Sequence, residues 1–253
     1  MLRVIPLINI RPDPKAIIKV FVRGLRAHEQ FIPSSYARFP LHEQEFVIDR
    51  ELFCRRSEFL KDGLKEAEDS ASDPDNPKPI VIENHDPADF DKYLRSIDTG
   101  ELDTPVDGND LRSFMLRLYV LTNHLRDLAM ANGAITHFMQ LSDQLNQLPT
   151  EREISYVWEA VPVYRDKMRQ LFVDYQIHEA PRESLVFDTD DTVPFEYLVD
   201  VALEFSDLAT QRGNHGRVGR NDDILKVKCL KKDWCYYHQH EGFHSFCHTR
   251  RST

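Results

Sequence analysis

Two kinds of secondary structure are marked in the stretch Phe46-Val-Ile-Asp-Arg-Glu-Leu-Phe-Cys54, followed by Arg55-Arg-Ser57-Glu-Phe59-Leu60. It opens with aromatic and β-branched residues, which are typical of a half-buried strand, and Glu45–Ile48 is predicted to be one. Further along, Ser57 and Glu58 precede spaced apolar side chains, which indicates the start of a helix. The stretch therefore predicts a strand that leads into a helix, as in a mixed α+β chain.

Two more strands and a well-marked helix are predicted on either side of this stretch. Ile17–Val22 and Pro79–Ile82 are the other short runs rich in β-branched residues. Asp86 can cap a helix and Pro87 can occupy its first position, while Thr99–Gly100 supplies the stop. Three strands with helices between them predict a small, mainly three-stranded sheet beside a helical cluster.

From Gly108 to about residue 210 the elements that the sequence predicts are all helices. Thr150 and Glu153 form a capping-box pattern, and Pro162 and Pro194 are each suited to the first turn of a further helix. Apolar spacing also predicts helices after Gly108 and between Leu128 and Leu145. The inner face of the last helix is predicted to consist of Phe195, Leu198, Ala202, Phe205 and Leu208.

The segment Lys65–Lys78 is acidic and has no large apolar residue. Such a composition is typical of a solvated surface loop. A specific acidic docking site is the alternative interpretation, and nothing in the sequence favours it.

Four motifs in order resemble the BTB/POZ family. They are the stretch from Phe46 to Leu60, Pro79–Ile82 with Asp86 to Leu94, the turn Thr99-Gly100-Glu101-Leu102, and Leu118-Tyr-Val-Leu-Thr-Asn-His-Leu125. Asp49 stands where the family has a histidine, and Asp98 stands where it has a tyrosine. The run from Ile154 to Asp174 resembles the helical extension of BTB proteins in filamentous fungi.

This resemblance implies a protein–protein interaction module and not an enzyme. It implies an α+β BTB/POZ fold over residues 16–145 and an all-helical extension over 146–210. The three prolines within residues 1–15 predict an irregular lead-in before that fold. The expected partners are proteins, either a second copy in a homodimer or a cullin-type scaffold, for which the chain would act as a ubiquitin-ligase adaptor. The partner-binding residues that the resemblance implies are Phe90, Tyr93, Leu94, Thr99, Gly100 and Glu101.

Composition restricts the other classes of function. A formal net charge of −10 argues against chain-wide binding to nucleic acid or anionic lipid, which need clustered basic side chains. No apolar run is long enough to span a bilayer, and no secretory signal is evident, so a cytoplasmic or nuclear location is expected. Phosphate-binding loops and nucleophile elbows are absent from the sequence, and Cys54 is interpreted as a core residue, so no catalytic residue is predicted.

The region 211–253 is a basic tail rich in cysteine and histidine. Cys235, His238, His244 and Cys247 form two pairs whose spacing suits one tetrahedral Zn²⁺. A solvated, loosely ordered tail without a cofactor is the other interpretation, and it is the one expected. The tail also contains a His-Glu-x-x-His match at His240, which is attributed to chance. A zinc-binding or nucleic-acid-associated regulator acting through this tail is the alternative function.

Overall fold

The computed structural model describes the part of the chain made up of residues 17–24, 42–69, 78–104, 108–163, 166–180, 193–214 and 234–239. The predicted lead-in at 1–15 lies outside these residues, as does most of the region 211–253.

A three-stranded sheet is built around β1 (Ile17–Gly24). This central strand pairs antiparallel with β2 (His42–Asp49) and parallel with β3 (Ile80–Glu83). Alternate side chains of β1 are buried, as expected for a sheet with one covered face. The predicted α+β class and the three-stranded sheet are confirmed. Both strands of the antiparallel pair are longer than predicted because their pairing continues to Gly24 opposite His42.

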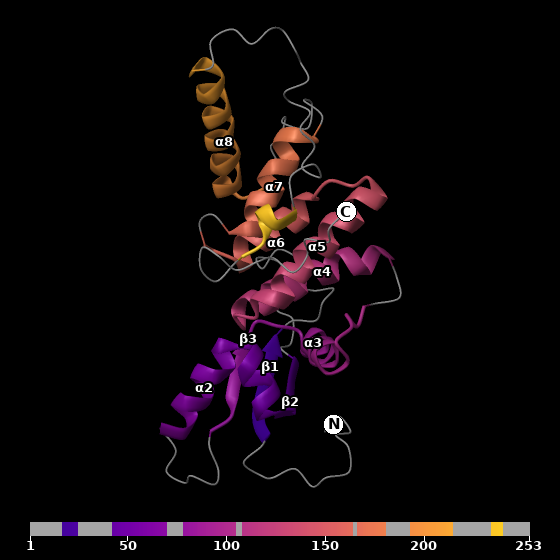
Figure 1. The fold of residues 1–253 in the computed structure, drawn as a ribbon, viewed down its shortest axis with the longest axis vertical. Coiled ribbons are helices and arrows are strands. Elements are labelled where there is room, and N and C mark those ends of the chain that lie inside the picture. The colour runs from indigo at the N-terminus through magenta and orange to yellow at the C-terminus, as the bar shows by residue number, and fades with distance from the viewer. Residues whose placement is uncertain are drawn as a thin grey trace. The chain divides into compact units, whose positions relative to one another are not determined.

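Helices pack against this sheet in the N-terminal part of the chain (Figure 1). Helix α2 (Glu58–Asp69) contacts β3, and α3 (Pro87–Thr99) contacts β1 and β2. The Phe46 ring of β2 meets the Phe90 ring of α3 edge to face, with centroids 4.9 Å apart. Aromatic pairs of this geometry stabilise a core beyond the area that they bury.

Helix α1 (Arg50–Arg56) is an element that the sequence did not predict. Asp49 ends β2 and caps α1 at once, because its side chain accepts a hydrogen bond of 2.7 Å from the Leu52 amide. Helix α2 in turn continues to Asp69, so the predicted loop beginning at Lys65 is wrong over its first residues.

Local capping signals identify other helix ends correctly. The Asp86 side chain accepts from the Ala88 amide, and Gly100 ends α3 in the left-handed region with φ 73°. The capping box of Thr150 and Glu153 opens α6 (Glu151–Ala160) with both reciprocal hydrogen bonds formed. These helices begin where their first orphan amides find acceptors.

The chain divides into two compact units, Met1–Ala131 and Asn132–Thr253. Helix α4 (Gly108–His124) belongs to the first unit, and the division falls within α5 (Leu128–Leu145). The division after Ala131 groups residues by their contacts. The predicted boundary between residues 145 and 146 separates two domains, and it stays a prediction.

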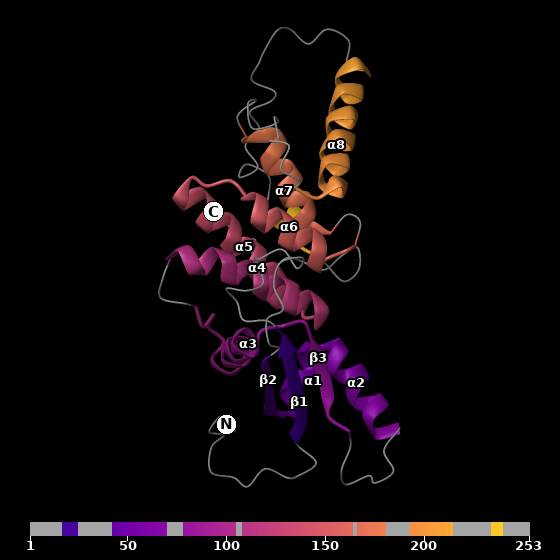
Figure 2. The same ribbon diagram turned by 180° about the vertical axis from the view of Figure 1, so that it is seen from behind.

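In the second unit, the described residues between 146 and 210 form helices and connecting turns, in line with the predicted helical extension. Helices α6, α7 (Lys167–His178) and α8 (Phe195–Asn214) contact one another, and α7 and α8 lie side by side in both views (Figures 1 and 2). The short 3₁₀ helix η5 (Trp234–Tyr237) contacts α7. Helix α7 begins later than predicted from Pro162, because the Asp166 side chain accepts from the amides of Met168 and Arg169 and sets the start there.

Helix α8 buries a different face from the predicted one. Tyr197 and Val201 are buried, whereas Phe195 is 74% exposed and Ala202 is also exposed. Leu198 and Phe205 are half-buried, and the Leu208 side chain lies outside the described ones. The predicted inner face of α8 is therefore wrong at Phe195 and Ala202.

Candidate functional site

Three of the six predicted partner-binding residues belong to the core of the first unit. Phe90, Tyr93 and Leu94 on α3 are almost completely buried. The Tyr93 hydroxyl donates to the Asp127 carboxylate at 3.2 Å, and burial raises the pKa of Tyr93. As a correction, these three side chains pack inside the unit and are not available to a partner at its surface. The helical stripe that they form is the inward face of α3.

The other three residues form an exposed turn at the end of α3. Thr99, Gly100 and Glu101 are all exposed. The Thr99 hydroxyl lies 2.9 Å from the Arg95 carbonyl oxygen and 3.1 Å from that of Glu101, and it accepts from the Glu101 amide at 3.2 Å. Further along, the Asp103 amide donates to the Ser96 hydroxyl at 2.9 Å. These bonds fix the backbone of the turn while leaving its surface open.

The sequence did not predict that several hydrogen bonds converge on the Asp127 carboxylate. This buried carboxylate accepts from the Arg56 guanidinium at 3.2 Å and from the Met130 amide at 3.1 Å, besides Tyr93. Ser57 makes a second connection nearby, donating to the Leu125 carbonyl at 2.7 Å and accepting from the Leu60 amide. The available signal for Asp127 was its place just before a predicted helix, which is typical of a cap.

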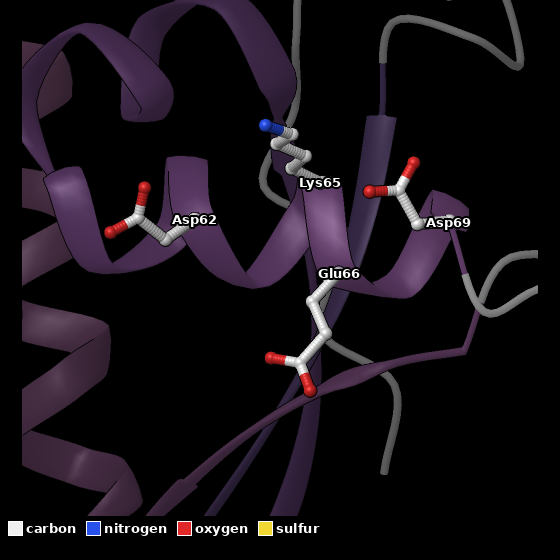
Figure 3. A pocket seen from close by; sticks show the side chains of 4 residues that line it. All are labelled: Asp62, Lys65, Glu66 and Asp69. Atoms are coloured by element: carbon white, nitrogen blue, oxygen red, sulfur yellow. The ribbon is translucent and has the colours of Figure 1, made fainter.

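The outer face of α2 carries charged side chains around a hollow of about 390 Å³. Asp62, Lys65, Glu66 and Asp69 line it. Figure 3 shows that their charged ends point in different directions, with Glu66 on the side opposite to Lys65 and Asp69. Asp62 also pairs with the Arg126 guanidinium at 3.2 Å. The group does not converge on one point, as a catalytic or metal site would require.

The second unit holds a short segment of the tail by side chains of α5 and α7. The side-chain amide of Asn132 donates to the main-chain carbonyl of Gln239 and accepts from the main-chain amide of Gln239, both at 2.8 Å. The Tyr237 hydroxyl donates to the Asp174 carboxylate at 2.6 Å, and both side chains are buried. For residues 236–239 the expectation of a solvated tail is therefore wrong.

The neighbouring tail residues are held as well. A nitrogen of the buried His238 ring, Nε2, lies 2.8 Å from the Thr136 hydroxyl. The Lys167 ammonium donates to the Tyr236 carbonyl at 2.9 Å and lies 5.2 Å from the centre of the Tyr236 ring. The Gln170 amide donates to the Tyr236 hydroxyl at 2.6 Å. The segment Tyr236–Gln239, here called the tail segment, is thus contacted along its whole length.

The predicted zinc ligands are only partly covered by the structure. His238 is among the described residues, and its Nε2 faces Thr136. The Cys235 side chain, His244 and Cys247 lie outside the described ones, as does His240. Among the residues that the structure describes, no three His, Cys, Asp or Glu side chains are grouped to hold a metal ion.

Cys54 is a free, half-buried cysteine on α1. Burial raises the pKa of its thiol, and this effect exceeds that of the nearby Arg50 charge. A reactive cysteine has a lowered pKa, because the thiolate is the nucleophile. Cys54 therefore has the environment of a packing residue.

Two histidines of the first unit are in direct contact. Nε2 of His85 lies 3.0 Å from Nδ1 of His124. Such a pair needs one nitrogen to donate and the other to accept, so it requires at least one neutral ring. Burial, together with the charge of His124, lowers the pKa of His85 to about 3, and partial burial lowers the pKa of His124.

Acidification is expected to destabilise the first unit through His85. The unfolded chain takes up a proton near the ordinary pKa of 6.5, whereas the folded chain resists it down to about pH 3. This contribution to stability is complete above pH 6.5 and is lost as the pH falls. Between pH 7 and pH 5 the expected loss is about 2 kcal/mol, at about 1.4 kcal/mol per pH unit below pH 6.5.

Urea denaturation at several pH values measures this loss. A His85→Gln chain, which lacks the titrating group, should lose less stability over the same interval. Equal pH dependence of the two chains would contradict the assignment to His85.

Comparisons with known proteins identify no family, because the chain matches no protein-family model, no curated protein and no solved structure. In the described segments, none of the helices combines the length and apolar character needed to cross a bilayer.

Proposed function

We propose that this protein acts by binding other proteins, through a BTB/POZ-like N-terminal region that is followed by a helical extension. It would serve as an adaptor, either by associating with a second copy or by docking a cullin-type scaffold. Catalysis has no part in this proposal.

The observation that carries the proposal is the agreement between the motifs and the elements that they form. The stretch from Phe46 to Leu60 spans the end of β2, all of α1 and the start of α2. The next motifs supply β3 and α3 in the same order as in the family that they resemble. The strands and helices that these motifs form follow one another in the order that the resemblance implies, and this supports the proposal.

The exposed turn Thr99-Gly100-Glu101 supports the binding role. Its backbone is already fixed by the Thr99 hydroxyl, so little ordering is needed when a partner binds. Glu101 adds an exposed charge at the end of this turn. Charged groups at a rim mainly set which partner is accepted and how fast it associates.

A charge reversal at this turn tests the proposal. The full chain, a Glu101→Arg variant and a Glu66→Arg variant would each be used to capture proteins from a native lysate, with quantitative mass spectrometry. Glu66→Arg is the matched control, because Glu66 is an exposed glutamate on the outer face of α2 (Figure 3). At least one protein is expected to be retained by the full chain and by Glu66→Arg, and to be reduced by about tenfold in Glu101→Arg.

Two outcomes would contradict the proposal. One is that no protein is specifically retained and the full chain also stays monomeric. The other is that every retained protein is retained equally by Glu101→Arg, which would exclude this turn as the binding surface.

A further inference from the structure

The tail segment Tyr236–Gln239 is recognised through its main chain. The Asn132 side chain pairs with both the amide and the carbonyl of Gln239, and Lys167 binds the carbonyl of Tyr236. A side-chain amide that bonds to both main-chain groups of one residue positions a backbone without regard to that residue's own side chain. Main-chain capture of this kind is a recurring way in which proteins bind peptides.

Side chains at two positions add selectivity. The Tyr237 hydroxyl reaches the Asp174 carboxylate, which is only 1% exposed, and His238 meets the Thr136 hydroxyl. A phenylalanine in place of Tyr237 would deprive the buried carboxylate of this hydrogen bond, and losing a hydrogen bond to a buried charge is costly. The site therefore favours tyrosine followed by histidine.

Tyr236 has a different environment from its neighbour. Its side chain is 45% exposed, and its hydroxyl accepts from Gln170 near the surface. The two adjacent tyrosines thus differ in burial. The Tyr237 hydroxyl contacts a charged carboxylate, whereas the Tyr236 hydroxyl contacts a neutral amide. Tyr236 provides a matched control for Tyr237.

From these contacts we infer that Asn132, Thr136, Lys167 and Asp174 form a peptide-binding site, and that the tail segment is its built-in ligand. The ligand class is a protein segment with a Tyr-His pair that follows an aromatic residue. A segment of this chemistry from another chain competes with the tail for the same side chains. The inference goes beyond the proposed function and does not depend on the Thr99–Glu101 turn.

A binding measurement on the full-length chain tests this inference. The probe is a fluorescein-labelled synthetic peptide with the sequence of residues 233–240, and the readout is fluorescence anisotropy under reducing conditions. The Tyr237→Phe chain, whose own tail competes less well, is expected to bind the probe about tenfold more tightly than the unchanged chain. The Tyr236→Phe chain should bind within about threefold of the unchanged chain, because an exposed hydrogen bond contributes little.

The second measurement needs no substitution in the protein. Excess unlabelled peptide is expected to speed hydrogen exchange at the Gln239 amide of the unchanged chain, because displacing the tail breaks its bond to Asn132. A peptide with phenylalanine at the position of Tyr237 should need about tenfold more material for the same effect.

The inference would be overturned if the Tyr237→Phe chain failed to bind the probe, or bound it no better than the Tyr236→Phe chain. Unchanged exchange at Gln239 in excess peptide would overturn it as well. Each of these results would leave the tail segment as a packing element only, and none would bear on the capture of proteins by the first unit.

Discussion

An Arg117→Met chain is expected to lose about 3–5 kcal/mol of unfolding free energy, because the change leaves the Asp89 carboxylate buried without its ion pair. The Arg117 guanidinium on α4 donates to Asp89 on α3 at 2.7 Å and 3.4 Å. Both side chains are only 5% exposed. Burial already raises the pKa of Asp89, and the Arg117 charge opposes that rise. Urea denaturation followed by circular dichroism measures the loss.

A double variant provides the control for this experiment. Replacing Asp89 with leucine in the Arg117→Met chain removes the remaining charge, so most of the lost stability should return. If the Arg117→Met chain unfolds at the same urea concentration as the unchanged chain, the buried ion pair does not stabilise the fold as expected. A double variant that is as unstable as the single one would contradict the expectation too.

The Tyr197→Ala change is expected to cost about 3–5 kcal/mol, as truncation of a large buried aromatic side chain does. Tyr197 is 1% exposed, its ring meets Trp158 edge to face at 5.0 Å, and its hydroxyl donates to Gln176 at 3.1 Å. In contrast, Phe195→Ala should change the unfolding free energy by less than about 0.5 kcal/mol, because surface substitutions rarely do more.

Thermal or urea unfolding followed by tryptophan fluorescence measures both changes, and one of the two tryptophans of the chain, Trp158, contacts Tyr197. The two changes lie two residues apart on α8, so they differ mainly in the face that each residue occupies. A larger effect for Phe195→Ala than for Tyr197→Ala would restore the helix face predicted from the sequence and contradict the structure.

Features set by neighbouring residues were predictable from the sequence. The Thr150 capping box, the Asp86–Pro87 start and the Gly100 stop each depend on backbone groups within a few residues. The α+β class followed from strand and helix patterns in the same way. Helix α1 was missed because its cap, Asp49, also ends a strand, and because it buries only Phe53.

Features set by distant residues were not predictable. Helix α8 has apolar residues on several faces, so its periodicity does not select one, and Trp158 of α6 decides which face is covered. The docking of the tail segment depends on Asn132, which is 107 positions away from Gln239 in the sequence. No local pattern encodes such a contact.

The candidate partner residues show the same limit. The resemblance implied six of them without separating the inward from the outward face of α3. Phe90, Tyr93 and Leu94 lie at helical spacing on one apolar stripe, and that stripe is the one that packs inside. The exposed residues Thr99 to Glu101 therefore remain as the candidate surface.

The native mass of the protein in its own cell shows whether it acts in complexes with other proteins. The full chain, tagged and kept at its natural level, would be isolated gently from a lysate and its complexes weighed by mass photometry. We expect it in complexes well above the 29.6 kDa of one chain, formed with a second copy or another protein. Recovery of the chain only as a 29.6 kDa monomer would contradict a role in protein–protein interaction.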